Sequence, residues 1–133
     1  MDHDSEHTIL IADDDVLFRR IGREVLEEVA IVIEAKNGQN AVDMYKEYSP
    51  ALTFLDIHMP VKDGKEALRE ILEINPKAYV IMFSADAVKD NVLQTSHAGA
   101  KGFLAKPFSK DMLLSRALAC PALKFRDQTR KSS

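Results

Sequence analysis

Leu52-Thr53-Phe54-Leu55-Asp56-Ile57-His58-Met59-Pro60-Val61-Lys62-Asp63-Gly64 is the stretch around which the chain is organised. Its apolar run, Leu52 to Leu55, predicts a short strand buried on both faces. Pro60 disfavours a helix at the residue before it, and Asp63-Gly64 indicates a turn that leads into a helix. Asp56 is therefore expected at the carboxyl tip of a central strand, where open α/β sheets bind ligands. An Asp there can also be a plain turn or capping residue, so the rest of the chain has to decide.

Composition limits the class of protein. The 133 residues, 46% hydrophobic and 29% charged, are enough for one globular domain with its own core. The net charge of −3 gives no reason to expect nucleic acid or an anionic membrane as the main partner. A lone cysteine, Cys120, excludes an intramolecular disulfide and fits a reducing compartment, so we expect a cytoplasmic protein. The polar, acidic N-terminus does not resemble a signal peptide, and no apolar run is long enough to span a membrane.

Apolar runs alternate with helical patterns along the chain. Strands are predicted at residues 8–12, 31–33, 52–55, 78–83 and 102–105. Helices are predicted at about 16–28, after the Asn37-Gly38 turn, after Asp63-Gly64, at about 87–97 and after an N-cap at Ser109. This alternation predicts an α/β fold: a flavodoxin-like, doubly wound (βα)5 sandwich with a parallel sheet in strand order 2-1-3-4-5. Right-handed crossovers place the first and last helices on one face and the other three on the opposite face.

The same patterns predict buried stripes and domain limits. Apolar residues recur at helical spacing in the first helix: Leu17, Ile21 and Val25, with Phe18, Leu26 and Val29 beside them. In the last helix the predicted stripe consists of Met112, Leu113, Ala117 and Leu118. We expect a disordered segment at 1–7, the folded domain at 8–120, and a tail or linker stub at 121–133.

Polar side chains follow the predicted strands directly. Asp13 and Asp14 come after the first strand, Asp56 ends the third, Ser84 ends the fourth and Lys106 follows the fifth. In a parallel sheet these ends share one edge, and the first and third strands are neighbours there. Each residue alone is most simply a turn, a cap or a solvated charge. Their joint placement favours a site.

The chemistry of that site follows from its charges. Three carboxylates held close together disfavour being ionised at the same time, and a divalent cation removes the conflict. Oxygen ligands select Mg²⁺ or Mn²⁺ over zinc. A hydroxyl from Ser84 and an ammonium from Lys106 suit a tetrahedral anion carried on Asp56, which indicates phosphoryl transfer onto a carboxylate.

Six motifs then carry a resemblance to a known family. They are Ile9-Leu10-Ile11-Ala12-Asp13-Asp14, Leu55-Asp56-Ile57-His58-Met59-Pro60, Asp63-Gly64, Phe83-Ser84-Ala85, Gly99-Ala100-Lys101-Gly102-Phe103 and Lys106-Pro107-Phe108. With these motifs the sequence, from about Thr8 to Leu118, resembles the receiver domain of bacterial response regulators, the phosphoacceptor module of two-component signalling. That family is not a set of classical enzymes: the resemblance implies self-catalysed phosphotransfer and autodephosphorylation only.

The resemblance implies a role for each site residue. Asp56 would be the phosphoacceptor, and Ser84 and Lys106 would contact the phosphoryl group. The Mg²⁺ site would be formed by Asp13, Asp14, Asp56 and the backbone carbonyl of His58. Phe103 would be the aromatic switch residue, rotating inward as Ser84 moves toward the phosphoryl group. The side chains of His58 and Asp86 would flank the path of an attacking water and tune dephosphorylation.

The implied partners are proteins. A histidine kinase or histidine phosphotransfer protein would donate the phosphoryl group. The surface formed by the fourth helix, fifth strand and fifth helix would change and signal to a downstream protein target, or form a phosphorylation-linked dimer. Neither a membrane nor direct nucleic-acid binding is expected.

Two alternatives belong to other classes. A haloacid-dehalogenase-type phosphatase also forms an aspartyl phosphate, but it needs a second Asp two residues after the nucleophile, where this chain has His58. A pseudo-receiver that binds partners without phosphorylation would not need the acidic pair, Asp56, Ser84 and Lys106 to be intact.

Overall fold

The structure, a computed structural model, describes residues 5–85 and 89–124. The strands are β1 (Thr8–Ala12), β2 (Ile31–Ala35), β3 (Leu52–Asp56), β4 (Val80–Ser84) and β5 (Gly102–Ala105). The helices are α1 (Val16–Leu26), α2 (Gly38–Tyr48), α3 (Gly64–Ile74), α4 (Lys89–His97) and α5 (Lys110–Leu118), preceded by a 3-10 turn, η1 (Ser5–His7). This βα alternation is the predicted one.

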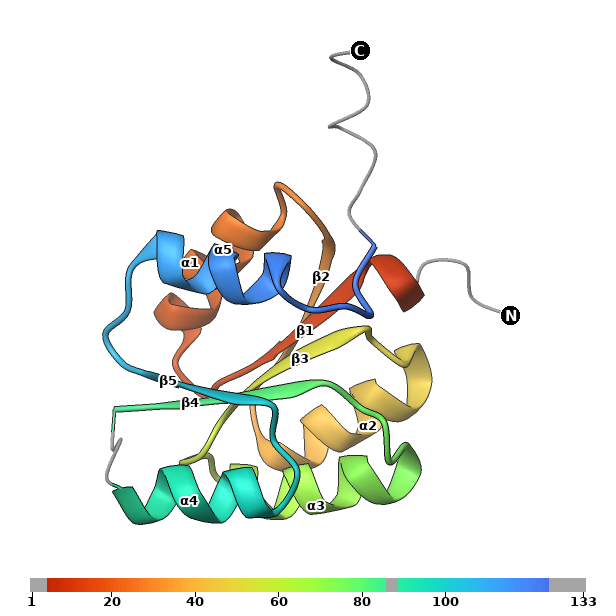
Figure 1. Cartoon of the computed structure of the whole chain (residues 1–133), viewed down its shortest axis with the longest axis vertical. Coiled ribbons are helices and arrows are strands. Elements are labelled where there is room, and N and C mark those ends of the chain that lie inside the picture. The colour runs from red at the N-terminus through yellow and green to blue at the C-terminus, as the bar shows by residue number, and fades with distance from the viewer. Residues whose placement is uncertain (1–4, 86–88, 125–133) are drawn as a thin grey trace.

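All strand pairs in the sheet are parallel, and the order is β2-β1-β3-β4-β5, which confirms the predicted topology. Helices α1 and α5 cover one face, while α2, α3 and α4 cover the other (Figure 1). Every residue of β1, β3 and β4 is buried, because both faces of these three strands are covered. The carboxyl ends of the strands therefore meet at one edge of the molecule.

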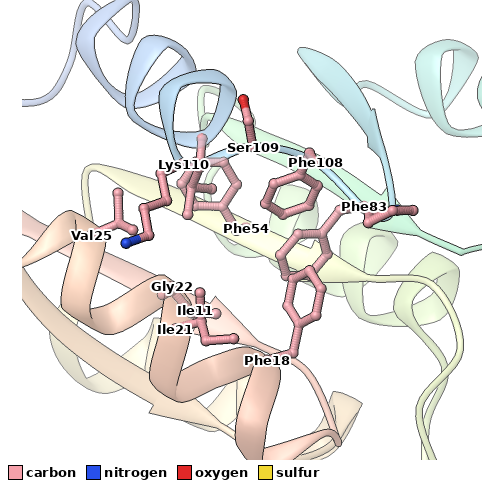
Figure 2. Close-up of a pocket in the computed structure, with 12 residues that line it drawn as sticks. Ile11, Phe18, Ile21, Gly22, Val25, Phe54, Phe83, Phe108, Ser109 and Lys110 are labelled. Atoms are coloured by element: carbon pink, nitrogen blue, oxygen red, sulfur yellow. The ribbon is translucent and has the colours of Figure 1, made fainter.

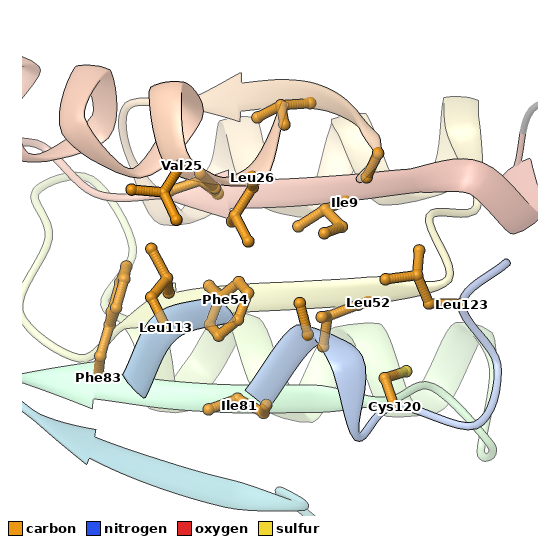
Figure 3. Packing of buried hydrophobic residues seen from close by; sticks show 14 of the residues in the cluster. Ile9, Val25, Leu26, Leu52, Phe54, Ile81, Phe83, Leu113, Cys120 and Leu123 are labelled. Atoms are coloured by element: carbon orange, nitrogen blue, oxygen red, sulfur yellow. The ribbon is translucent and has the colours of Figure 1, made fainter. Parts of the chain in front are cut away.

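The sheet separates two apolar cores. Alternate side chains of β3 enter different cores: Leu52 and Phe54 pack toward α1 and α5, whereas Leu55 packs toward α2 and α3. Figure 3 shows the first core, where Val25 and Leu26 of α1 lie opposite Phe54 and Leu113. The sheet is held from both sides, which fixes the positions of the residues at its carboxyl edge.

Capping side chains fix where four helices begin. Asp15, Asn37, Asp63 and Ser109 each accept a backbone N–H from the first turn of the helix that follows. Asn37-Gly38 and Asp63-Gly64 are thus caps followed by the first helical residue, rather than separate turns. Both glycines are needed sterically, because a Cβ would lie 1.9 Å from the carbonyl oxygen of Lys62 at Gly38 and 2.0 Å from that of Asp56 at Gly64.

The predicted helix stripes are partly wrong. Leu17 and Ile21 of α1 are 64% and 45% exposed, and Met112 and Leu118 of α5 are 46% and 50% exposed. The two helices pack against the sheet and each other through a narrower face. Its buried residues are Gly22, Val25, Leu26, Leu113 and Ala117. Strand β4 also begins later than predicted, at Val80, because the N–H of Ala78 still donates to Asn75 in the turn after α3.

The ends of the described chain meet each other. The N–H of Lys124 donates to the carbonyl of Glu6 at 2.7 Å, and the N–H of Ala51 donates to that of Ser5 at 3.1 Å. Leu123 is buried in the first core. Structure therefore extends beyond the expected limits of 8 and 120, to Ser5 and Lys124. Within residues 5–85 and 89–124, no helix has the length and apolar character needed to cross a membrane.

Candidate functional site

The carboxyl edge of the sheet brings three acids together. Asp13 follows the last residue of β1, Asp14 comes next, and Asp56 is the last residue of the neighbouring strand β3. Each offers a carboxylate oxygen, and these oxygens lie within 4.8 Å of one another. The structure therefore brings together the acids that the sequence predicted to be neighbours.

The three consecutive acids of residues 13–15 have different surroundings. Asp13 is fully buried, and its Oδ1 accepts the N–H of Asp15 at 3.0 Å. Asp15 turns outward and caps α1 through Leu17 and Phe18. Asp14 is exposed. Their mutual repulsion is reduced because the Asp13 carboxylate is buried, the Asp15 carboxylate caps a helix and the Asp14 carboxylate is exposed to solvent.

Lys106 reaches the acids from the loop after β5. Its Nζ lies 2.6 Å from Oδ2 of Asp13 and 3.5 Å from Oδ2 of Asp56. The same ammonium is 4.2 Å from the ring centroid of Phe18 and 5.1 Å from that of Phe83. The side chain is 14% exposed. Two aromatic rings and two carboxylates therefore hold this one cation.

Asp56 is electrostatically unusual. Burial, followed by the nearby charge of Asp13, raises its pKa from 3.8 to about 6, although the ammonium of Lys106 works in the opposite direction. The residue is only 5% exposed. A single lysine thus does not neutralise this cluster, and a further cation would stabilise the ionised form of Asp56.

Ser84 and Phe103 lie on the neighbouring strands. Ser84 ends β4, is fully buried, and accepts the backbone N–H of Lys106 at 2.9 Å through its carbonyl. Phe103 of β5 is half-buried against the core on the α2 and α3 side. It also lines a cavity of about 140 Å³ with Val92 and Thr95 of α4. There is thus open space beside the Phe103 ring.

A tightly closed loop follows Asp56. The N–H of Gly64 donates to the carbonyl of Ile57 at 2.6 Å, and that of Lys62 donates to Pro60 at 2.7 Å. The second bond closes a three-residue turn centred on Val61, whose φ of 69° is strained for a β-branched residue. His58 lies in this loop with its side chain exposed. Asp86, the other predicted tuning residue, falls within 86–88, outside the described residues.

Arg19 is a site residue that sequence reasoning missed. Its Nη1 donates to the backbone carbonyl of Asp13 at 2.6 Å, and its Nε donates to Glu34 of β2 at 2.9 Å. Arg23 donates to the other oxygen of Glu34 at 2.6 Å, and the two arginines lower the pKa of Glu34 against the effect of its burial. This network ties the end of β1 to β2. No local pattern marks an arginine in α1 as a partner of Asp13, so the contact was not predictable.

The donor set fits a hard divalent cation. Asp13, Asp14 and Asp56 are the group of potential metal ligands found among the described residues, and they offer only oxygen. Mg²⁺ is bound by such oxygens and keeps several waters, which the exposed side at Asp14 leaves room for. Lys106 takes one oxygen of Asp13, so a bound ion would share this carboxylate with the ammonium.

Comparison with known proteins agrees with this geometry. Residues 9–118 match the family described as the response regulator receiver domain. Chemotaxis protein CheY of Bacillus subtilis (strain 168) is 44% identical over 110 residues, 81% of this chain and 92% of that protein. Chemotaxis protein CheY of Halobacterium salinarum is 42% identical over 107 residues, 80% of this chain and 89% of that protein.

A solved structure is also similar along most of the chain. It is the crystal structure of the CheX–CheY–BeF3–Mg²⁺ complex from Borrelia burgdorferi, in which the matching chain superimposes with a TM-score of 0.79. The two sequences are 32% identical, and the match covers 84% of this chain and 87% of the other.

Proposed function

This chain belongs to the response regulator receiver domain family, as a receiver of the CheY type, and we propose that Asp56 is its phosphoacceptor. The observation that supports this most is the position of Asp56. It is the buried terminal residue of β3, beside two acids and within 3.5 Å of a lysine ammonium. Asp13 is already paired with Lys106, and Asp14 is exposed. Asp56 combines burial, an opposite charge and a place at the sheet edge.

In the proposed reaction, a carboxylate oxygen of Asp56 attacks the phosphorus of a phosphohistidine. An O–P bond forms while the N–P bond of the donor breaks, and the imidazole leaves with the electron pair and takes a proton from solvent. Mg²⁺, held by Asp13, Asp14, Asp56 and the backbone carbonyl of His58, would supply neutralisation of the phosphoryl charge. Lys106, free to turn from Asp13, and the hydroxyl of Ser84 would hold the remaining phosphoryl oxygens.

The output is a two-state change. A phosphoryl group makes contacts with Ser84 and Lys106 that an unmodified Asp56 cannot make, and such differential contacts are what shift a conformational equilibrium. Phe103 would respond by rotating, and the 140 Å³ cavity that it shares with α4 provides space beside the ring. The affected surface is that of α4, β5 and α5.

The proposed partners are a histidine kinase or histidine phosphotransfer protein as donor and a protein target as receiver of the signal. Asp86 and His58 would set the lifetime of the acyl phosphate. The phosphatase alternative is disfavoured because an exposed His58, and not an acid, stands two residues after Asp56.

The test is direct phosphorylation with a small donor. The full chain is incubated with acetyl phosphate and Mg²⁺, and intact and peptide masses are recorded. We expect one added phosphoryl group, located on Asp56 and absent without the metal. Asp56→Asn should abolish it, while Asp43→Asn, an exposed acid on α2, should leave it unchanged. Full modification of Asp56→Asn would refute the assignment.

A further inference from the structure

A cavity of about 210 Å³ lies between α1 and α5, on the side of the sheet opposite α4. Ten of its twelve lining residues are apolar, and the exceptions are Ser109 and Lys110. Figure 2 shows the rings of Phe18, Phe83 and Phe108 gathered at one end. Apolar cavities of about 150 Å³ in other proteins stay dry and accept a benzene ring. This one is therefore large enough for a single aromatic ring and a short chain.

The cavity remains because the side chains that join α1 to α5 leave space unfilled beside Gly22. Gly22 sits in the interior of α1, where a glycine costs about 1 kcal/mol relative to alanine. A Cβ there would lie 3.1 Å from Ile11 Cδ1 and 3.8 Å from Leu113 Cδ2, so an alanine would need only a small shift of one flexible methyl. Ile21 lines the opening and stays 45% exposed. The glycine therefore keeps the space open at a cost to the stability of α1. An alanine at this position would reduce that cost.

The lining of the cavity includes one cationic side chain, that of Lys110. The Lys110 side chain runs from α5 toward Val25 of α1, away from the three phenyl rings (Figure 2). Within the described part of the chain Lys110 makes no ion pair. An apolar space with aromatic walls at one end and an ammonium group at the other is complementary to a ring that carries a carboxylate on a short chain.

We propose that this cavity binds a small aromatic carboxylate, with the ring among Phe18, Phe83 and Phe108 and the carboxylate at Lys110. A ligand of this size and a single exposed ion pair give a Kd on the order of 10⁻⁴–10⁻³ M. Phe18 is in edge contact with both Phe83 and Phe108, with centroids 5.8 and 5.3 Å apart, and it also carries Lys106 on its face.

A ligand bound in the cavity would therefore affect the surroundings of Asp56 through Phe18. A ring that shifts Phe18 moves the aromatic face against which the Lys106 ammonium rests, 4.2 Å from the centroid. This consequence rests on the proposed function, whereas binding itself does not. Binding and phosphorylation are measured separately, so failure of one leaves the other standing.

The experiment is an amide NMR titration of the full, unphosphorylated chain with 3-phenylpropionate. We expect saturable shifts centred on Gly22, Val25 and Leu113. Ile21→Phe, which lets a ring enter from the exposed rim, should abolish saturation, while Leu17→Phe on the same helix but outside the cavity should bind as the parent does. Gly22→Ala is a second variant that reduces the volume of the cavity, because its added methyl group lies near Ile11 and Leu113. Thermal unfolding of each variant verifies that it is folded.

The charge is tested separately. Lys110→Met should weaken 3-phenylpropionate about two- to fivefold, as expected for an exposed ion pair, and leave uncharged 3-phenylpropanol unaffected. Shifts that stay linear at high ligand concentration, or that centre on another surface, overturn the proposal. If Leu17→Phe and Ile21→Phe lost 3-phenylpropionate binding equally, the binding surface would extend beyond the cavity, as for a protein partner. This result would also overturn the proposal.

Discussion

The ammonium of Lys106 pairs with Asp13 at 2.6 Å, more closely than with Asp56, whose nearest carboxylate oxygen is 3.5 Å away. The resting lysine thus neutralises the fully buried acid first. In the proposed phosphorylated state Lys106 has to change partner, and this exchange is what the first prediction tests.

Replacing Lys106 should separate phosphorylation from its output. In Lys106→Ala, acetyl phosphate and Mg²⁺ should still modify Asp56, because the metal carries most of the charge neutralisation. The contact that differs between the two states is lost, so beryllofluoride should no longer shift the amide NMR signals around Phe103 as it does in the parent. Lys106→Arg should restore these shifts poorly, because the planar guanidinium group of arginine does not replace a compact ammonium group. Full shifts at Phe103 in Lys106→Ala would contradict this account.

Asp56 should make the stability of the metal-free chain depend on pH. Its pKa is raised from 3.8 to about 6 in the fold, so the folded state binds the proton more tightly than the unfolded state. The contribution of Asp56 to the free energy of unfolding therefore falls as pH rises from about 4 to about 6. The full cost of ionising this carboxyl group, on the order of 3 kcal/mol, is present above that range.

Asp56→Asn mimics the neutral carboxyl group and removes that cost. Measured by urea unfolding without Mg²⁺, the free energy of unfolding of Asp56→Asn should exceed that of the parent by about 1–3 kcal/mol at neutral pH. The difference should shrink as pH falls toward 4. Asp43→Asn, at an exposed position, should show no such pH-dependent gain. If the gain in free energy of unfolding of Asp56→Asn stayed constant over this pH range, the burial of an ionised carboxylate would be excluded as its cause.

Mg²⁺ should stabilise the fold, and Asp14 should be required for this. The three carboxylates lie within 4.8 Å, and an ion bound only by the folded state raises the melting temperature by mass action. Millimolar Mg²⁺ should raise it in the parent and by much less in Asp14→Asn. Asp15→Asn is a matched control, because asparagine still caps α1. Equal shifts in the parent and in Asp14→Asn would remove Asp14 from the site.

Arg19 should act on the metal site through the backbone of Asp13. Arg19→Gln loses the bond to the Asp13 carbonyl and the pair with Glu34, and should lower the free energy of unfolding by about 1–2 kcal/mol. It should also weaken Mg²⁺ binding, measured by calorimetry under conditions where both proteins are folded. The exposed neighbour Arg20 provides the control as Arg20→Gln. Unchanged Mg²⁺ affinity in Arg19→Gln would restrict its role to stability.

Local signals carried most of the fold prediction. Continuous apolar runs, such as the one that ends at Asp56, identify strands covered on both faces, and this alone implies a layered α/β architecture. Capping residues are equally local: Ser109 bonds to Met112 three residues later, as its place before a helical pattern predicts. Parallel topology then brings Asp13, Asp14 and Asp56 to one edge whatever the side-chain details.

The tertiary structure alone decided how those residues are paired and which faces are covered. Leu17 and Ile21 share the helical period of Val25, yet only Val25 is buried, because the rotation of α1 is set by its packing on β1, β2 and α5. Likewise, Lys106 lies 93 residues from Asp13 along the chain and prefers it to Asp56. The hydrophobic pattern of the sequence indicates which side chains are apolar and where a helix or strand ends. Helix orientation and the choice among nearby charges depend on contacts between distant segments, and no local pattern contains them.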